Sequence, residues 1–135
     1  MSEVSIMMID DNSSANLYHS IMIQEAGIDE SFVQQFTSSE EALQSLWKVF
    51  KEQTNCLPST ILIDINMPGI NGWDCVEEIA KIKQESDWQP SIYMVSNSQH
   101  PSDLAKAKEN PHITDIKEKH LEKEFFEQLL VMRLN

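Results

Sequence analysis

Residues 61–69 read Ile61-Leu62-Ile63-Asp64-Ile65-Asn66-Met67-Pro68-Gly69. The run before Asp64 is short, rich in β-branched residues and apolar at every position, which is typical of a fully buried central strand in a parallel sheet. Pro68 and Gly69 end that strand. Asp64 is therefore predicted at the carboxyl end of a central strand, where open α/β sheets bind their ligands. A carboxylate in such apolar surroundings is costly unless another group pairs with it.

Four further short runs, before and after this stretch, are also predicted as strands, and a helical pattern follows each strand. These runs cover residues 4–9, 32–37, 92–95 and 112–116, and the last run leads on to Lys119. The predicted helices begin at residues 12–14, 38–41, 73, 101 and 122, and they end at residues 27, 50, 82, 109 and 134. Strict alternation of this kind predicts one α/β domain over residues 1–135, with a doubly wound five-stranded parallel sheet of the (βα)5 type.

The spacing of apolar residues predicts which side chains pack inside. The first helix is predicted to bury a face with Leu17 and Ile21, accompanied by Ala15, Tyr18 and Met22. The last helix is predicted to place five side chains on or near its core side, namely Phe125, Phe126, Leu129, Leu130 and Met132. The histidines have no ligand spacing and are predicted at the surface: His19, His100, His112 and His120. Cys56 and Cys75 are predicted as small packing residues, because neither has an activating neighbour in the sequence.

Composition and charge argue against several classes of function. The chain has 135 residues, of which 41% are hydrophobic and 24% are charged, and its formal net charge is −12. Nucleic-acid surfaces and anionic membranes both attract clustered Lys and Arg, so this acidic chain is predicted to bind neither. Residues 1–3 lack the basic start of a signal peptide, and no apolar run reaches the length of a membrane span. A cytoplasmic protein is therefore expected.

Polar residues stand at the carboxyl ends of four of the predicted strands, namely Asp10 and Asp11, Asp64, Ser96, and Lys119. The carboxyl ends of parallel strands lie along one rim of the sheet, so we expect these side chains to converge. Carboxylates a few ångströms apart oppose one another's ionisation. A hard divalent cation relieves that conflict and leaves positions open for a phosphoryl oxygen. The sequence therefore predicts a site for Mg²⁺, with Mn²⁺ as an alternative.

These residue types suit phosphoryl transfer. Asp64 is a candidate carboxylate nucleophile toward an activated phosphorus. Mg²⁺, Lys119 and the Ser96 hydroxyl would neutralise charge on the transferred group. The product would be an aspartyl phosphate, which water can hydrolyse. Structural roles remain alternatives: the two aspartates before the first helix as caps, Ser96 as a turn hydroxyl and Lys119 as a solvated cation.

The sequence resembles a response-regulator receiver domain of two-component signalling, of the single-domain, chemotaxis-regulator-like type. The resemblance covers essentially the whole chain and is carried by Asp10-Asp11, by the string from Asp64 to Gly72, by Ser96 and by Lys119. It implies a flavodoxin-like sheet with the strand order 2-1-3-4-5, and no output domain within the chain is expected. It further implies that Asp64 is the phosphoacceptor, that Ser96 and Lys119 contact the phosphoryl group, and that Mg²⁺ is held by Asp10, Asp11, Asp64 and the backbone carbonyl of Asn66.

The resemblance also implies a type of activity and a set of partner proteins. It implies a regulator rather than an enzyme, whose chemistry is limited to Mg²⁺-dependent self-phosphorylation and autodephosphorylation. The phosphoryl donor would be a phosphohistidine on a sensor histidine kinase or a histidine phosphotransfer protein. The added charge would switch a protein–protein interface toward a downstream protein target.

Two positions depart from the family pattern. His120 stands where family members usually have Pro after the site lysine, so the Lys119–His120 bond is expected to be either trans with a shifted loop or cis. Ile116 stands where the family often carries Tyr or Phe, and Tyr93 is a candidate substitute for that ring. These departures keep open an alternative, a receiver-like interaction module that does not switch. A hydrolase of small phosphate esters is less favoured, because Asn66 stands where a second catalytic Asp is needed.

Overall fold

The computed structural model describes residues 4–52, 57–97 and 100–134. Five parallel strands in these ranges form one sheet in the order β2-β1-β3-β4-β5. The strands are β1 (Ile6–Ile9), β2 (Val33–Phe36), β3 (Thr60–Asp64), β4 (Ser91–Ser96) and β5 (Asp115–Glu118). The helices are α1 (Ser13–Glu25), α2 (Ser39–Glu52), α3 (Gly72–Gln84), α4 (Pro101–Glu109) and α5 (Lys123–Leu134), with a short 3-10 turn η1 (Glu30–Phe32) before β2. The predicted doubly wound fold and its strand order are confirmed.

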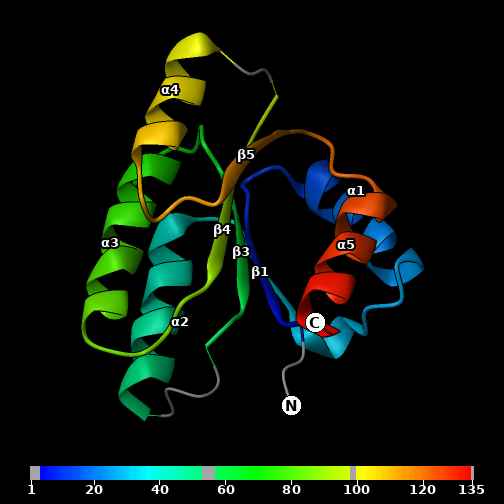
Figure 1. Cartoon of the computed structure of the whole chain (residues 1–135), viewed down its shortest axis with the longest axis horizontal. Coiled ribbons are helices and arrows are strands. Elements are labelled where there is room, and N and C mark those ends of the chain that lie inside the picture. Colours follow the sequence, from blue (N-terminus) through cyan, green and yellow to red (C-terminus); the bar gives the residue numbers. More distant parts are fainter. Residues whose placement is uncertain (1–3, 53–56, 98–99, 135) are drawn as a thin grey trace.

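Helices cover both faces of the sheet, as Figure 1 shows: α1 and α5 lie on one side, and α2, α3 and α4 lie on the other. Each side has its own cluster of buried apolar side chains against the sheet. β3 lies between β1 and β4, and all of its residues are buried. Burial on both faces explains why residues 61–63, before the final aspartate, are all apolar.

The parallel register aligns the strand ends on which the site depends. Ile9 of β1 pairs with Ile63 of β3, so the residues that follow them in the chain, Asp10 and Asp64, lie on neighbouring strands at the same level. Ser96 of β4 pairs with Glu118 of β5, the residue before Lys119. The rim formed by the carboxyl ends of β1, β3, β4 and β5, called the carboxyl rim below, therefore gathers the predicted site residues.

Two glycines shape the turn between β3 and α3. Gly69 has a φ of +76°, a left-handed conformation that other residues rarely adopt. Gly72 begins α3 so close to β3 that an added Cβ would lie 2.6 Å from the backbone oxygen of Asp64. The side chain of Asn71 accepts the N–H of Asp74 at 2.9 Å and so caps α3. The turn is therefore compact, and it fixes where Asp64 ends its strand.

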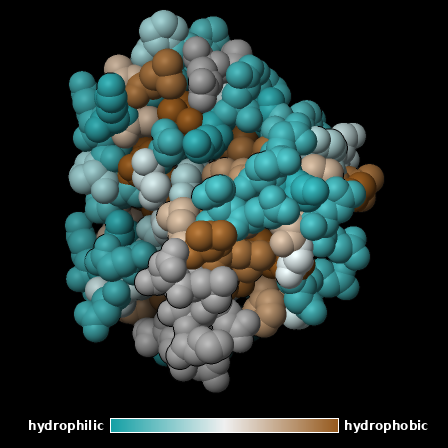
Figure 2. Space-filling view, turned by 45° about the vertical axis from the view of Figure 1, so that its right-hand side comes forward, coloured by the Kyte–Doolittle hydropathy of each residue, from teal (hydrophilic) through white to brown (hydrophobic). Residues whose placement is uncertain are grey.

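The predicted inward face of α1 is right for Ala15 and Met22, which pack inside, but wrong for its two main residues. Leu17 is 64% exposed and Ile21 is 43% exposed, while the buried residues of the helix are Ala15, Asn16, His19 and Ile23. The helix turns inward a stripe that contains two polar side chains, because both find hydrogen-bond partners there. The prediction that His19 lies at the surface is wrong for the same reason. Figure 2 shows the side of the molecule with α1 and α5, where hydrophobic residues gather near the centre of a largely hydrophilic surface.

Smaller predictions had mixed outcomes. The fifth strand covers Asp115–Glu118 rather than residues 112–116, and Met132 of α5 is 53% exposed rather than part of the core. Phe126 and Leu129 are buried as predicted. Cys75 is buried too, and burial raises the pKa of its thiol to about 11, which fits a packing residue. Cys56 and residues 1–3 lie outside the described residues.

Within the described ranges, no helix combines the length and the apolar character that crossing a membrane requires.

Candidate functional site

The segment after β1 places Asp10 by hydrogen bonds to both its side chain and its backbone. The Asp10 carboxylate accepts the N–H of Asn12 at 2.9 Å, and its backbone carbonyl accepts the side-chain amide of Asn16 at the same distance. The cap of α1 is Asn12, whose side chain accepts the N–H of Ala15 at 2.9 Å. Asp10 and Asp11 are therefore not needed as caps, and both carboxylates are available at the carboxyl rim.

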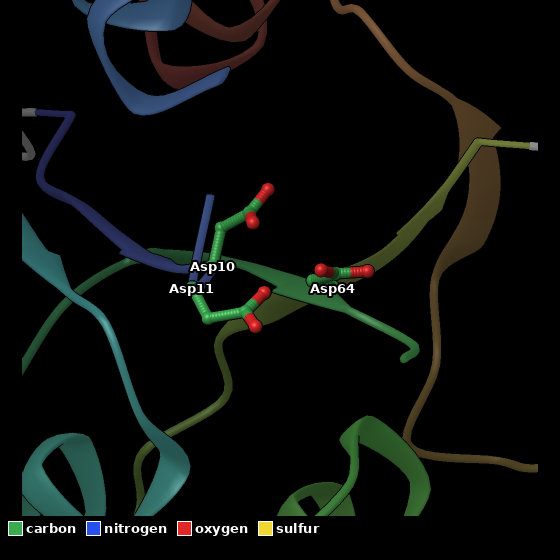
Figure 3. Close-up of side chains that lie close together, drawn as sticks. All are labelled: Asp10, Asp11 and Asp64. Carbon is green, nitrogen blue, oxygen red and sulfur yellow. The ribbon is translucent and has the colours of Figure 1, made fainter. Parts of the chain in front are cut away.

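Three carboxylates converge on this rim. Ligand oxygens of Asp10, Asp11 and Asp64 all lie within 4.8 Å of one another. Figure 3 shows the two neighbouring aspartates after β1 beside the end of β3, from which Asp64 projects. Asp10 and Asp64 are buried, whereas Asp11 is exposed. Two carboxylates of the cluster thus lie in the protein interior, and the third, Asp11, is in contact with solvent.

Lys119 supplies a positive charge to this cluster. Its Nζ lies 2.8 Å from Asp10 and 3.3 Å from Asp64, and its side chain is only 4% exposed. A buried ammonium is costly without partners, and here it has two. Lys119 comes from the segment between β5 and α5. Its ion pair with Asp10 therefore joins residues that are 109 positions apart (119 − 10).

The pKa values reflect this crowding. Burial raises the pKa of Asp64 to about 6, and the negative charge of Asp10 adds to that effect, while Lys119 and the N–H of Asn66 oppose it. Burial disfavours the ammonium of Lys119, but hydrogen bonds and charge from the two carboxylates outweigh this, so the pKa of Lys119 is raised. At neutral pH the site therefore holds an ionised lysine beside Asp64, whose ionisation is opposed by burial and by the charge of Asp10.

Ser96 and Asn66 flank the cluster. Ser96 is the last residue of β4 and is 2% exposed, and its backbone carbonyl accepts the N–H of Lys119 at 2.8 Å. The backbone N–H of Asn66 donates to the Asp64 carboxylate at 3.2 Å. Every predicted site residue thus lies on the carboxyl rim or directly beside it. Metal ligation by the Asn66 carbonyl and phosphoryl contact by the Ser96 hydroxyl stay predictions.

The positions that depart from the family pattern have defined environments. The Lys119–His120 peptide bond is cis, which is one of the two expected alternatives. Ile116 is buried among the apolar side chains on the α2, α3 and α4 side of the sheet. Tyr93 is buried on the opposite side, where its ring meets Phe125 edge to face at 5.0 Å between centroids. Tyr93 and Ile116 therefore pack on different faces of the sheet.

Sequence reasoning missed three residues that hold the site in place. Asn16 binds the backbone of Asp10, His19 accepts the N–H of Leu121 at 2.9 Å, and Glu40 of α2 accepts the N–H of Ile70 in the turn after β3 at 3.3 Å. Asn16 and His19 are three residues apart on one face of α1, shortly after Asp10. Polar residues at that spacing beside a predicted site were the available signal.

The side chains present fit a hard divalent cation. All three clustered groups offer carboxylate oxygens, which Mg²⁺ prefers, and one of them faces solvent. A cation beside Asp64 would also relieve the repulsion that raises its pKa. The arrangement thus combines a buried nucleophilic carboxylate, a place for a metal ion and an ammonium that can meet an anionic group.

Comparison with known proteins gives a consistent result. The family model described as response regulator receiver domain matches residues 6–134. No curated protein matches the chain. A two-component response regulator from Cytophaga hutchinsonii has 29% sequence identity and a TM-score of 0.85, and the match covers 100% of this chain and 99% of that one.

Two further solved structures share the fold. A response regulator receiver protein from Dyadobacter fermentans has 23% identity and a TM-score of 0.80, with 98% of each chain covered. The receiver domain of a histidine kinase from Arabidopsis thaliana, solved in complex with Mg²⁺, has 21% identity and a TM-score of 0.77, with 97% of this chain and 90% of that chain covered.

Proposed function

The chain belongs to the response regulator receiver domain family of two-component signalling, and we propose that Asp64 is the residue on which it accepts the phosphoryl group. Members of this family are phosphoacceptor regulators. One observation carries the proposal: Asp64 ends the buried central strand beside Asp10 and Asp11, with the ammonium of Lys119 held 3.3 Å from its carboxylate. A nucleophilic carboxylate, a place for a metal ion and a cation for the incoming group occur together.

Mg²⁺ is the ion that we propose for the cluster, and Mn²⁺ has the same ligand preference. Asp10, Asp11, Asp64 and the backbone carbonyl of Asn66 would hold it. When bound, the ion supplies positive charge that offsets the charge of the phosphoryl oxygens. The three carboxylates carry more negative charge than Lys119 can balance, so the cluster favours a second cation.

The chain's own residues act on the phosphoryl group in defined ways. A carboxylate oxygen of Asp64 forms a bond to phosphorus while the bond from phosphorus to the donor breaks, and the donor leaves with that electron pair. Lys119 exchanges its contact with Asp64 for one with a phosphoryl oxygen, and the Ser96 hydroxyl donates to another. In dephosphorylation, water attacks phosphorus while the bond to the Asp64 oxygen breaks; the carboxylate leaves with that electron pair, and inorganic phosphate and a proton are released.

The proposed donor is a phosphohistidine on a sensor histidine kinase or a histidine phosphotransfer protein. The phosphoryl group adds a charge of about −1.5 to −2 to the carboxyl rim. That charge draws Ser96 and Lys119 toward it, and both residues lie at the ends of strands that lead into α4 and α5. We therefore propose that the chain signals by changing how this region binds a partner protein.

Direct labelling tests the phosphoacceptor. The protein is mixed with acetyl phosphate and MgCl₂, and intact mass spectrometry follows the gain of one phosphoryl group. We expect labelling of the wild type, loss of labelling with EDTA, and no labelling of Asp64→Asn. Asp87→Asn removes an exposed carboxylate between α3 and β4, at the end of the sheet opposite the carboxyl rim, and should label like the wild type. Undiminished labelling of Asp64→Asn would overturn the assignment.

A second candidate is a receiver-like module that binds its partner without switching. It is favoured by Ile116, a buried aliphatic side chain where a mobile aromatic ring is common in the family. The two candidates differ in what beryllofluoride, a mimic of the bound phosphoryl group, does to the protein. Backbone amide NMR shifts that spread from the carboxyl rim into α4 and β5 support switching, whereas shifts confined to the rim support the non-switching module.

A further inference from the structure

The segment from Lys119 to Glu122 joins β5 to α5 and is held at three points. The N–H of Lys119 donates to the backbone oxygen of Ser96 at 2.8 Å. The N–H of Leu121 donates to Nε2 of His19 at 2.9 Å, and the hydroxyl of Tyr18 donates to Glu122 at 2.6 Å. Two of these three contacts come from α1, which lies beside α5 on the same face of the sheet (Figure 1). The position of the backbone that follows Lys119 in the chain therefore depends on contacts with α1.

The contact made by His19 is the buried one. His19 and Leu121 are each only 4% exposed, so the N–H of Leu121 has no solvent to replace its partner. The ring of His19 packs against Phe126 and His120, with centroids 6.3 and 5.6 Å away. A neutral imidazole that accepts at Nε2 carries its proton on Nδ1. Burial, reinforced by His120, lowers the pKa of His19 to about 4, so the ring is neutral and able to accept.

The surroundings restrict how the segment can respond to loss of this bond. His19 and Leu121 line a cavity of about 10 Å³ together with Asp10 and Asp64. That space is at the lower limit for a single water molecule, so it gives the segment little room to relax inward and the Leu121 N–H little solvent. Without its acceptor, the Leu121 N–H reaches bulk solvent when the segment moves outward. Such a movement carries Lys119 away from the two carboxylates.

We propose that His19 is a positioning residue for Lys119: its Nε2 holds the backbone two residues after Lys119, and this keeps the Lys119 ammonium aimed at the phosphoryl site. The inference rests on the proposed function, because it assigns His19 to phosphorylation of Asp64. His19 itself need not touch the phosphoryl group.

The test compares variants of His19 in the same labelling reaction with acetyl phosphate and MgCl₂. His19→Phe keeps a ring against Phe126 but offers no acceptor, and we expect its initial labelling rate to fall about tenfold or more, because small displacements of positioned groups have effects of this order. His19→Gln offers an amide oxygen near the place of Nε2 and should recover most of the rate. His112→Phe makes the same change at the opposite end of β5, where His112 meets Lys83, and should leave the rate unchanged.

A double-mutant cycle separates positioning from general damage. If His19 acts through Lys119, His19→Phe should slow the wild type but have little further effect in Lys119→Met. Mg²⁺ affinity, measured by calorimetric titration, should not weaken in His19→Phe, because the carboxylates stay in place. Thermal unfolding checks that the variants fold. If His19→Phe does not fold, His19→Leu takes its place, because it also lacks an acceptor.

Each outcome decides a different claim. Equal rates for wild type and His19→Phe, a failure of His19→Gln to recover the rate, or additive losses with Lys119→Met would overturn the role of His19 alone. A wild type that acetyl phosphate does not label would overturn the proposed function, and the role of His19 with it.

Discussion

The amino and carboxyl ends of the sheet differ in how their polar side chains are paired. At the amino end of the sheet, Ser5 and Ser59 exchange hydrogen bonds: each hydroxyl oxygen accepts the other residue's N–H at 3.0 Å. No charge is involved, and the pairing closes the gap between the starts of β1 and β3. At the carboxyl rim, three carboxylates crowd around one ammonium, and the pKa of Asp64 is raised. One end is arranged for stability, whereas the other keeps a charge conflict that a cation resolves.

The difference predicts that substitutions at the two ends have different consequences. Changes at the carboxyl rim should alter phosphorylation and, in one case, raise stability. Changes at the amino end should lower stability and leave phosphorylation intact. The predictions below run from the largest expected effect to the smallest.

Lys119→Met should give the largest change in labelling rate among substitutions that keep the phosphoacceptor in place. It removes the only ammonium found in contact with Asp10 and Asp64 among the described residues, so the labelling rate with acetyl phosphate should fall about 100-fold, as is usual when one charge-stabilising donor is lost. Lys117→Met is the matched control, because Lys117 pairs with Asp115 on an exposed part of β5. Equal rates for the two variants would contradict the role of the rim lysine.

Gly72→Ala should damage both stability and labelling. The new Cβ would lie 2.6 Å from the Asp64 backbone oxygen, so β3 or α3 must shift, at a cost of about 1–3 kcal/mol in the free energy of unfolding. Gly27, just after the carboxyl end of α1, provides the contrast. Its φ is +93°, but nothing lies near an added Cβ. Gly27→Ala should therefore lower stability by about 1 kcal/mol without changing the labelling rate. Urea unfolding and intact mass measure the two effects.

Asp64→Asn should abolish labelling yet stabilise the metal-free fold. The pKa of Asp64 is about 6 in the folded chain, whereas an unperturbed Asp has a pKa of about 3.9. Between these values the folded state binds more protons than the unfolded state, so the contribution of Asp64 to stability falls as pH rises from about 4 to about 6 and stays low above it. Replacing the carboxylate should thus raise the free energy of unfolding at pH 7 by about 1–3 kcal/mol.

Urea unfolding with EDTA, repeated across this pH range, provides the measurement. The gain in Asp64→Asn over wild type should grow with pH up to about 6 and then level, following the pKa of Asp64. Added MgCl₂ should shrink the gain, since binding to the folded wild type stabilises it. Asp87→Asn serves again as the exposed control. A gain that does not vary with pH would contradict the account of crowding at the rim.

Ser59→Ala should have the smallest effect and should act on stability alone. Its hydroxyl accepts the N–H of Ser5 and donates to the Ser5 backbone oxygen. Loss of these bonds should lower the free energy of unfolding by about 1 kcal/mol. The labelling rate should match that of the wild type, and a clear decrease would show that the two ends of the sheet are coupled.

Most of the fold could be predicted because the pattern of each element is local. Residues 61–63 are apolar on both faces of the strand, and Pro68 and Gly69 follow soon after, so both the central strand and its end could be predicted. The candidate site could be predicted as residues at strand ends, since parallel topology brings such ends together. Once the alternation of strands and helices is recognised, the predicted fold therefore also predicts which residues form the site.

The details that could not be predicted depend on contacts between distant segments. The inward face of α1 was assigned to Leu17 and Ile21 because they are apolar, but Asn16 and His19 take that side. Their partners lie in other segments: the backbone of Asp10 for one, and Leu121, 102 residues away, for the other. For the Lys119–His120 bond, the sequence left cis and trans open, and the bond is cis. Polarity alone was a poor guide wherever a buried partner was available.

The ion pair between Asp10 and Lys119 also sets an order of events during synthesis. These residues are 109 positions apart (119 − 10), so a ribosome adding about 5–20 residues per second makes the aspartate roughly 5–20 s before the lysine. The lysine that supplies the counter-charge to Asp10 and Asp64 is therefore the last residue of the site to be made, after both carboxylates and after Ser96.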